Sequence, residues 1–325
     1  MGALLSPPIL FFALGMLATL FRSGLKIPYP IPKLLSLYLL FAIGLRGGVE
    51  LHEAGFSWSL VWTMLAAMGM ASLMPLVTYS ILRLKLRAVD AGAIAAAYGS
   101  ISAVTFITAQ AVLDSAHIPH SGSLVAAMAL MESPAIVVAV LLVRQEGAKY
   151  AEQGSTGQTA AKIEWGKLLH EAFLNGPVFL LLGSMAVGLI TGAKGRLLLE
   201  PFSDKIFAGI LCFFLLDLGL LAARRLRDLG KAGPFCITFA IVAPVVQAGV
   251  GLLLARVLKL NEGDTLLFMM LAGSASYIAV PAALRLVIPE ANAGLYVPMA
   301  LAITFPLNVT IGIPVYLSIV RWLLE

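Results

Sequence analysis

The sequence predicts an all-α membrane protein with ten transmembrane helices, arranged as two inverted five-helix repeats whose broken helices cross at the midplane. Three observations lead to this prediction. The chain of 325 residues is 60% hydrophobic and only 12% charged, long apolar runs recur along it, and one small polar cluster occurs twice. A soluble core cannot bury so much apolar surface, so we expect the bilayer to be the solvent of this chain.

The apolar runs define the predicted spans, because a helix needs about 20 mainly apolar residues to cross the hydrocarbon layer. The spans are expected at residues 6–21, 31–49, 58–82, 91–113, 122–143, 173–193, 203–222, 233–257, 264–287 and 294–320. The longest polar stretch follows the fifth run and divides the spans five and five. The predicted units are a first repeat at 1–143, a connector at 144–170 and a second repeat at 171–325.

Lys and Arg residues are distributed unevenly between the two predicted sides of the membrane. With ten spans, 15 of the 22 fall on the side of the connector and 7 on the other side. Cytoplasmic loops carry the excess of positive charge, so we expect the connector to be cytoplasmic and both termini to lie outside. The net charge of +5 then reflects topology and contact with anionic lipid, and it does not indicate nucleic-acid binding.

The repeated cluster has the pattern G-S-x-S, once in "AYGSISAVTF" at 97–106 and again in "AGSASYIAVP" at 272–281. Asp90 and Asp264 each stand nine residues before the glycine of their cluster, so one offset of 174 covers the Asp, the Gly and both serines. Such clusters often serve only close helix packing, but duplication at equivalent positions favours a binding site. Because each repeat has an odd number of spans, the second copy must be inverted, as is typical of secondary transporters.

Gly, Ser and Thr weaken a helix at both clusters. Free peptide groups at membrane depth are tolerated only where protein or a watery cavity satisfies them. Two breaks that meet near the midplane would present N–H groups at half-helix N-termini, together with rotatable hydroxyls. The sequence therefore predicts a small-anion site that needs no arginine.

Glu132 is a charged residue inside a predicted span, where a charge is costly unless it faces a cavity or a partner. We expect it to coordinate a cation or carry a proton; a structural hydrogen bond to a neighbouring helix is the alternative. Thr304 and Asn308, in the corresponding span of the second repeat, offer oxygens suited to a hard cation such as Na⁺. The four histidines fall in loops or at span ends without ligand spacing, and we expect them to be solvated.

Three segments, "DAGAIAAAYGSISAVTFITAQAVLDS", "ALMESPAIVVAV" and "GSASYIAVPAALRLVIPEANAGLYVPMALAITFPLNVTIGIP", resemble the sodium-dependent bicarbonate transporter family of bacterial inner-membrane permeases. The likeness extends over essentially the whole chain. It implies ten helices in two inverted repeats, divided into core and gate domains, and usually a homotrimer. In some members it also implies a PII-like regulator on the cytoplasmic face.

The resemblance also implies roles for individual residues. The anion would be held where the broken helices cross, by Gly99, Ser100, Ser102, Thr105, Gly273, Ser274 and Ser276, and Tyr277 is our own addition to this set. The resemblance also implies a nearby sodium ion, for which our candidate ligands are Glu132, Ser102, Ser276, Thr304 and Asn308. This chain has Tyr277 where bicarbonate-transporting members carry an acid, and Glu132 where they carry Asp, so Tyr277 is predicted to hydrogen-bond a small oxyanion or carboxylate.

The predicted function is secondary active transport of a small anion, as sodium-coupled bicarbonate uptake by alternating access. The alternative keeps the fold and transports a small organic acid, with proton or sodium coupling. A membrane enzyme is disfavoured because Ser100 and Ser274 have no His or Lys base at their depth and no H-E-x-x-H motif occurs; no signalling domain of a sensor is recognisable. The expected partners are the anion, sodium, lipid, further copies of the chain and the PII-like regulator, with no cofactor beyond the coupling ion.

Overall fold

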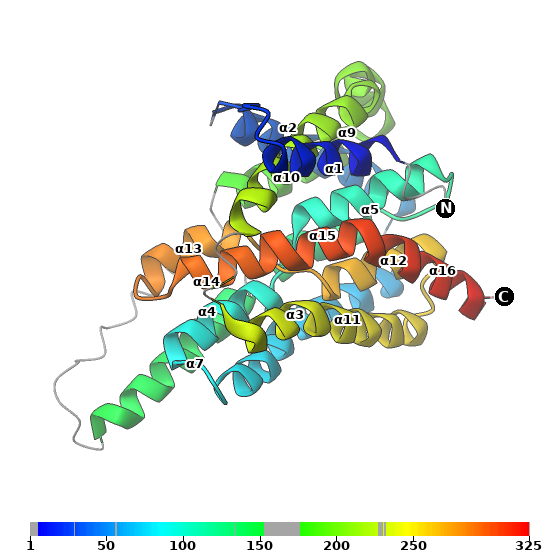
Figure 1. The fold of residues 1–325 in the computed structure, drawn as a ribbon. Coiled ribbons are helices and arrows are strands. Elements are labelled where there is room, and N and C mark those ends of the chain that lie inside the picture. The colour runs from blue at the N-terminus through cyan, green and yellow to red at the C-terminus, as the bar shows by residue number, and fades with distance from the viewer. Residues whose placement is uncertain are drawn as a thin grey trace.

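The computed structural model describes residues 6–28, 30–55, 57–132, 134–152, 176–226, 230 and 232–324. Within these ranges the chain forms helices and connecting turns and contains no β-strand (Figure 1). Eight of the described helical segments are long and apolar enough to cross a membrane. The predicted class, an all-α membrane protein, is confirmed.

The helices follow the predicted runs in order. The first half contains α1 (Pro7–Leu20), α2 (Pro30–Ala54), α3 (Trp58–Leu82), α4 (Ala88–Gly99), α5 (Ala103–Ser115), α6 (Ser123–Met131) and α7 (Pro134–Glu152). The second half contains α9 (Gly176–Glu200), η2 (Pro201–Lys205), α10 (Phe207–Arg225), α11 (Gly233–Val257), α12 (Glu262–Ala272), α13 (Ala279–Val287), α14 (Ala293–Pro298), η4 (Met299–Thr304), α15 (Phe305–Leu307), η5 (Asn308–Gly312) and α16 (Ile313–Leu324).

Two of the ten predicted spans contain no single helix that is long enough to cross the membrane. The first forms α1, which is apolar but only 14 residues long. The ninth is divided between α12, with 11 residues, and α13, with nine. Ten membrane crossings therefore remain a prediction, although every predicted run contains helix.

The fifth predicted span contains an interruption that the sequence analysis missed. α6 ends at Met131 and α7 begins at Pro134. Proline has no N–H to continue the helical ladder and disfavours the α conformation of the residue before it. α7 then continues to Glu152, into the predicted connector, whose residues from 153 onward lie outside the described ranges.

The helices pack as two groups that each combine both halves of the chain. The first, which we call the four-helix group, consists of α1, α2, α9 and α10 with η2, and lies at the top of Figure 1. In it α1 packs along α10 and α2 along α9. Glycines allow these close crossings, because a Cβ on Gly15 would overlap the carbonyl of Leu216 and one on Gly188 would overlap that of Leu45.

The second group, which we call the larger group, contains α3 to α7 and α11 to α16. Two aspartates hold it together in a reciprocal way. Asp90, in the first turn of α4, accepts a hydrogen bond from the Asn292 amide at 3.1 Å. Asp264, in the first turn of α12, accepts one from the Ser121 amide at 2.7 Å. Each acid thus fixes the loop that follows the other broken helix.

Candidate functional site

The two duplicated clusters are real helix breaks, and they lie against each other. α4 ends at Gly99 and α5 begins at Ala103, while α12 ends at Ala272 and α13 begins at Ala279. The Ser102 amide donates to Ser274 Oγ at 2.9 Å, and the Ser276 amide donates to the Ala97 carbonyl at 2.8 Å. Backbone groups that leave one helix therefore find partners in the other half of the chain.

The hydroxyl side chains of the first break form hydrogen bonds within the first half of the chain. Ser102 is the N-cap of α5, and its Oγ accepts hydrogen bonds from the Thr105 amide at 3.2 Å and from Thr105 Oγ1 at 2.9 Å. The Ser100 hydroxyl donates to the backbone carbonyl of Glu132 at 3.3 Å. Gly99 faces Pro75 of α3, and a Cβ there would lie 2.6 Å from Pro75 Cδ. Only glycine fits this contact.

The second break is longer and depends on another helix. The Gly273 carbonyl accepts a hydrogen bond from Asn308 Nδ2 at 2.8 Å. Ser276 Oγ accepts one from the Val280 amide at 3.2 Å, which caps the start of α13. A Cβ on Gly273 would lie 2.6 Å from the carbonyl oxygen of Pro244 in α11, so this glycine also packs on a helix that carries an internal proline.

A cavity of about 50 Å³ lies between the two breaks and the four-helix group. The wall from the larger group, which we call the polar wall, contains Ser102, Glu132, Ser276 and Tyr277 among apolar residues such as Ile101, Val104, Ile107 and Met128. The opposite wall, from α2, α9 and α10, is mainly apolar and contributes Ser36, Leu39, Leu40, Pro177, Leu181 and Phe214. Since one water needs roughly 10–15 Å³ on this measure, the space suits an anion of about four heavy atoms.

Three hydroxyl groups in the polar wall are available as donors. Ser102 and Ser276 accept hydrogen bonds from the backbone. Tyr277 Oη is buried beside the Ser102 hydroxyl and has no well-formed hydrogen bond to it or to another described residue. Because a hydroxyl can donate while it accepts, three O–H groups remain for a ligand.

Glu132 contributes the carboxylate in this wall. Its backbone is held by Ser100, but no described residue forms an ion pair or hydrogen bond with its side chain. No Lys or Arg is among the residues that line the cavity. The site therefore combines several neutral donors with one uncompensated acid.

The structure gathers only part of the predicted sodium set around the cavity, namely Ser102, Ser276 and Glu132. Thr304 Oγ1 instead donates to the Ala240 carbonyl at 2.7 Å and bonds Tyr98 Oη at 2.8 Å. Asn308 holds the second break, and its Oδ1 is buried without a partner among the described residues. Neither of these two lines the cavity.

The predicted anion set divides in the same way. Ser102, Ser276 and Tyr277 line the cavity. The others are buried and support the wall from behind: Gly99, Ser100, Thr105, Gly273 and Ser274. Cavity residues of the four-helix group, such as Ser36 and Phe214, were missed, because no sequence signal shows which face of α2 or α10 meets the breaks.

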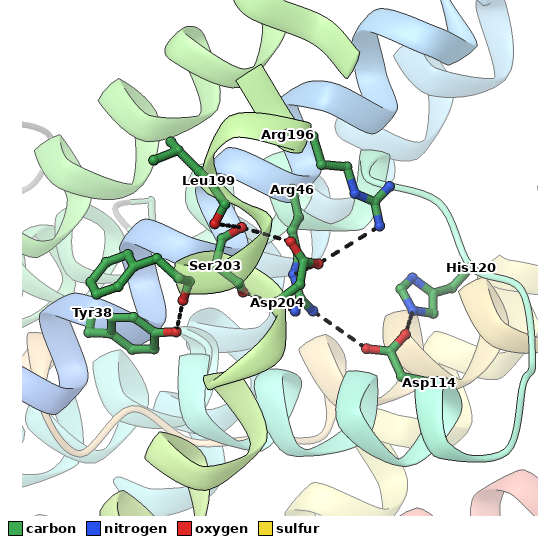
Figure 2. A network of polar contacts seen from close by, with 9 residues as sticks. Tyr38, Arg46, Asp114, His120, Arg196, Leu199, Ser203 and Asp204 are labelled. Carbon is green, nitrogen blue, oxygen red and sulfur yellow. Dashed lines mark hydrogen bonds and ion pairs between the residues drawn. The ribbon is translucent and has the colours of Figure 1, made fainter. Parts of the chain in front are cut away.

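A charged network lies further along α2 and is shown in Figure 2. Arg46 of α2 lies 2.8 Å from Asp204 in η2, and its Nη2 donates to the Ser203 carbonyl at 3.0 Å. Arg46 Nη1 also lies 3.7 Å from Asp114 of α5. This last ion pair joins the four-helix group to the larger group.

His120 extends the network and corrects the expectation that the histidines are solvated. Its side chain is only 8% exposed, and Nε2 lies 2.9 Å from Asp114 Oδ1. Burial alone would lower the pKa of His120, but the hydrogen bond to Asp114 and the charges of Asp114, Glu50 and Asp264 raise it above its ordinary value.

Arg46 and Ser36 are ten residues apart on α2, about 15 Å along the helix, so the ion pair and the cavity lie near opposite ends.

Comparison with known proteins agrees with the resemblance seen in the sequence. A family model described as the Na⁺-dependent bicarbonate transporter superfamily matches residues 7–321, which include both breaks, the cavity and the charged network. No curated protein matches the chain in sequence. With nearly its full length matched, the chain belongs to the Na⁺-dependent bicarbonate transporter superfamily.

Proposed function

We propose that the protein takes up a small anion by secondary active transport, with bicarbonate as the substrate and sodium as the coupling ion. The observation that carries this proposal is the cavity between the two breaks. It brings the hydroxyls of Ser102, Ser276 and Tyr277 into one cavity with the carboxylate of Glu132, which no described residue pairs. The family that the chain belongs to transports bicarbonate with Na⁺.

Electrostatics explains why a cation must accompany the anion. Two negative charges about 5 Å apart repel by roughly 3 kcal/mol at an effective dielectric constant of 20. When Glu132 is ionised, it therefore opposes an anion in the cavity unless a cation also binds. Sodium prefers oxygen ligands, as hard cations do, and Glu132 and Ser276 supply them there. Ser102 Oγ would join only after losing one of the two hydrogen bonds that it accepts from Thr105. Thr304 and Asn308 would bind the sodium ion only after losing their hydrogen bonds to Ala240, Tyr98 and Gly273.

Alternating access would move the larger group against the four-helix group. The Arg46–Asp114 pair joins the groups near one end of α2, while the cavity lies near the other end. The reciprocal contacts of Asp90 and Asp264 support two inverted repeats, as found in transporters that work by this mechanism. With the predicted topology, in the bacterial inner membrane with both termini outside, the ion pair lies outside and Ser36 lies toward the cytoplasm. The homotrimer and the PII-like regulator remain expectations from the resemblance.

A small organic acid is the second candidate, with a proton on Glu132 as the coupling ion. The apolar wall that includes Leu39, Leu181 and Phe214 favours it, since a short hydrocarbon group packs there without losing hydrogen bonds.

Flux into proteoliposomes tests the proposal. We expect uptake of labelled bicarbonate to rise several-fold under an inward sodium gradient, and Glu132→Gln to remove this stimulation. Gly69→Ala is a suitable control, because a Cβ at Gly69 meets no atom within 4 Å. Uptake of labelled acetate coupled to a proton gradient would favour the second candidate. Absence of flux for both anions, with and without either gradient, would overturn the proposal.

A further inference from the structure

We propose that Glu132 also selects the transported anion, by accepting a hydrogen bond from an anion oxygen that carries a proton. This inference rests on the proposed function and concerns the same cavity. It predicts that the site takes small anions with an O–H group and discriminates against anions of equal size without one.

The inventory of donors and acceptors in the cavity leads to this conclusion. The polar side chains that line it are Ser36, Ser102, Glu132, Ser276 and Tyr277. The four hydroxyls can all donate, whereas an ionised carboxylate only accepts. The site thus offers donors at several points and one strong acceptor, which no described side chain occupies.

Bicarbonate matches this arrangement group by group. Two of its oxygens share the negative charge and can accept from the hydroxyls of Ser102, Ser276 and Tyr277. Its third oxygen carries the proton and can donate to Glu132. Hydrogen bonds from O–H to a charged oxygen are short and about twice as strong as neutral ones, so this contact adds affinity as well as orientation.

Nitrate and acetate have the same number of heavy atoms as bicarbonate, and formate has one fewer; none of the three carries an O–H. In the same position, each would turn an oxygen, a C–H or a methyl group toward the carboxylate. Glu132 would then lose water without gaining a hydrogen bond, and a buried acceptor left unpaired is costly. Sites built to bond a substrate O–H reject analogues that lack it far more strongly than sites that recognise only size.

One contact positions Glu132 for this role, and the equivalent residue of the second half cannot replace it. The Ser100 hydroxyl holds its backbone at 3.3 Å, directly after α6 ends. When Pro134 is aligned with Pro306, the equivalent position in the second half is Thr304, whose hydroxyl is already bonded to Ala240 and Tyr98. Of these two equivalent positions, only Glu132 therefore offers a free acceptor among the described residues. A carboxylate has two oxygens, so one can contact the coupling cation while the other accepts from the anion.

Equilibrium binding to the purified full chain tests this role. Dissociation constants for bicarbonate, glycolate, nitrate and acetate would be measured by calorimetry at pH 8 in saturating sodium. We expect bicarbonate to bind at least tenfold more tightly than nitrate or acetate, with glycolate nearer to bicarbonate. In Glu132→Gln the amide can accept from bicarbonate or donate to nitrate, so nitrate should gain affinity and the preference should fall to within about threefold. Glu132→Asp should keep the preference.

Tyr277→Phe is the matched control, because it removes a donor that every anion uses. It should weaken the binding of all four anions and leave the preference for bicarbonate over nitrate unchanged. A gain in nitrate binding by Glu132→Gln cannot come from misfolding. If Glu132→Gln strengthens all anions equally, the residue acts by charge alone and the selectivity role is wrong. If wild type binds nitrate as tightly as bicarbonate, the selectivity role also fails while the proposed transport function stands. If no anion binds and no flux occurs, the transport function itself fails.

Discussion

The break between α4 and α5 and the break between α12 and α13 share the sequence G-S-x-S but are held in different ways. The first is three residues long, and its hydroxyls cap α5 and reach the backbone at Glu132. The second runs from Gly273 to Ile278, and its carbonyl at Gly273 depends on the side chain of Asn308. The shorter break is thus held by Ser102 and Thr105 together with Ser274 and the Glu132 backbone, whereas the longer break also needs the side chain of Asn308.

The chemistry at the cavity differs as well. The first half contributes Glu132, and the equivalent Thr304 is engaged elsewhere. The second half contributes Tyr277, and the residue equivalent to it by the offset of 174 is Ala103. The two halves therefore contribute different chemistry to the cavity, with the acid from one half and the phenol from the other.

The largest effect is expected where both breaks are alike, at their glycines. Gly99→Ala and Gly273→Ala each place a Cβ within 2.6 Å of a proline atom, and overpacking of this kind costs about 1–3 kcal/mol. We expect a lower melting temperature and at least a tenfold loss of transport in each variant. Gly69→Ala should match wild type. Unchanged stability in both variants would show that the breaks are not tightly packed.

The difference in support between the breaks is tested by removing one hydrogen bond from each. Asn308→Leu leaves the buried Gly273 carbonyl unpaired and should destabilise the protein by about 1–3 kcal/mol. Ser100→Ala removes a long bond of 3.3 Å and should cost less than about 1 kcal/mol. Thermal unfolding of both variants provides the comparison. Equal losses would contradict the account of the two breaks.

Measurements of stability and of sodium stimulation distinguish the roles of the equivalent residues Glu132 and Thr304. Thr304→Val removes the partner of Tyr98 Oη and the donor to the Ala240 carbonyl, so we expect a stability loss of about 1–2 kcal/mol with sodium stimulation retained. Glu132→Gln should show the reverse pattern. A Thr304→Val variant that is stable but insensitive to sodium would place Thr304 at the ion site after all.

The smallest effect is expected at His120, which follows the first broken helix. Its raised pKa means that the charged form is favoured in the folded state. The stabilisation is therefore fully present below the ordinary His pKa and is lost as pH rises through the raised value. Because Asp114 is 48% exposed, we expect less than about 1 kcal/mol. Melting temperatures from pH 6 to 9 should fall more steeply for wild type than for His120→Gln; parallel curves would contradict this.

Much of the fold was predictable because apolar length and helix-weakening residues are local signals. The ends of α3 and α11 agree with the predicted spans 58–82 and 233–257, and both duplicated clusters break their helices. The interruption before Pro134 was missed although Glu132 and Pro134 are local signals for it, because the prediction followed the total apolar length of the run. Thr304 and Asn308 were predicted at the ion site from their oxygens and from their position in the span that corresponds to that of Glu132. Their hydrogen bonds to Ala240 and Gly273 depend on tertiary packing that no local pattern shows.

The central claim is that the cavity between the breaks binds an anion and a cation together through Glu132. The most direct test is the dissociation constant of bicarbonate for the purified protein as a function of sodium concentration, in wild type and Glu132→Gln. We expect affinity to increase with sodium in wild type and to be independent of sodium in the variant. The same sodium dependence in both proteins, or no bicarbonate binding by wild type at any sodium concentration, would contradict the claim.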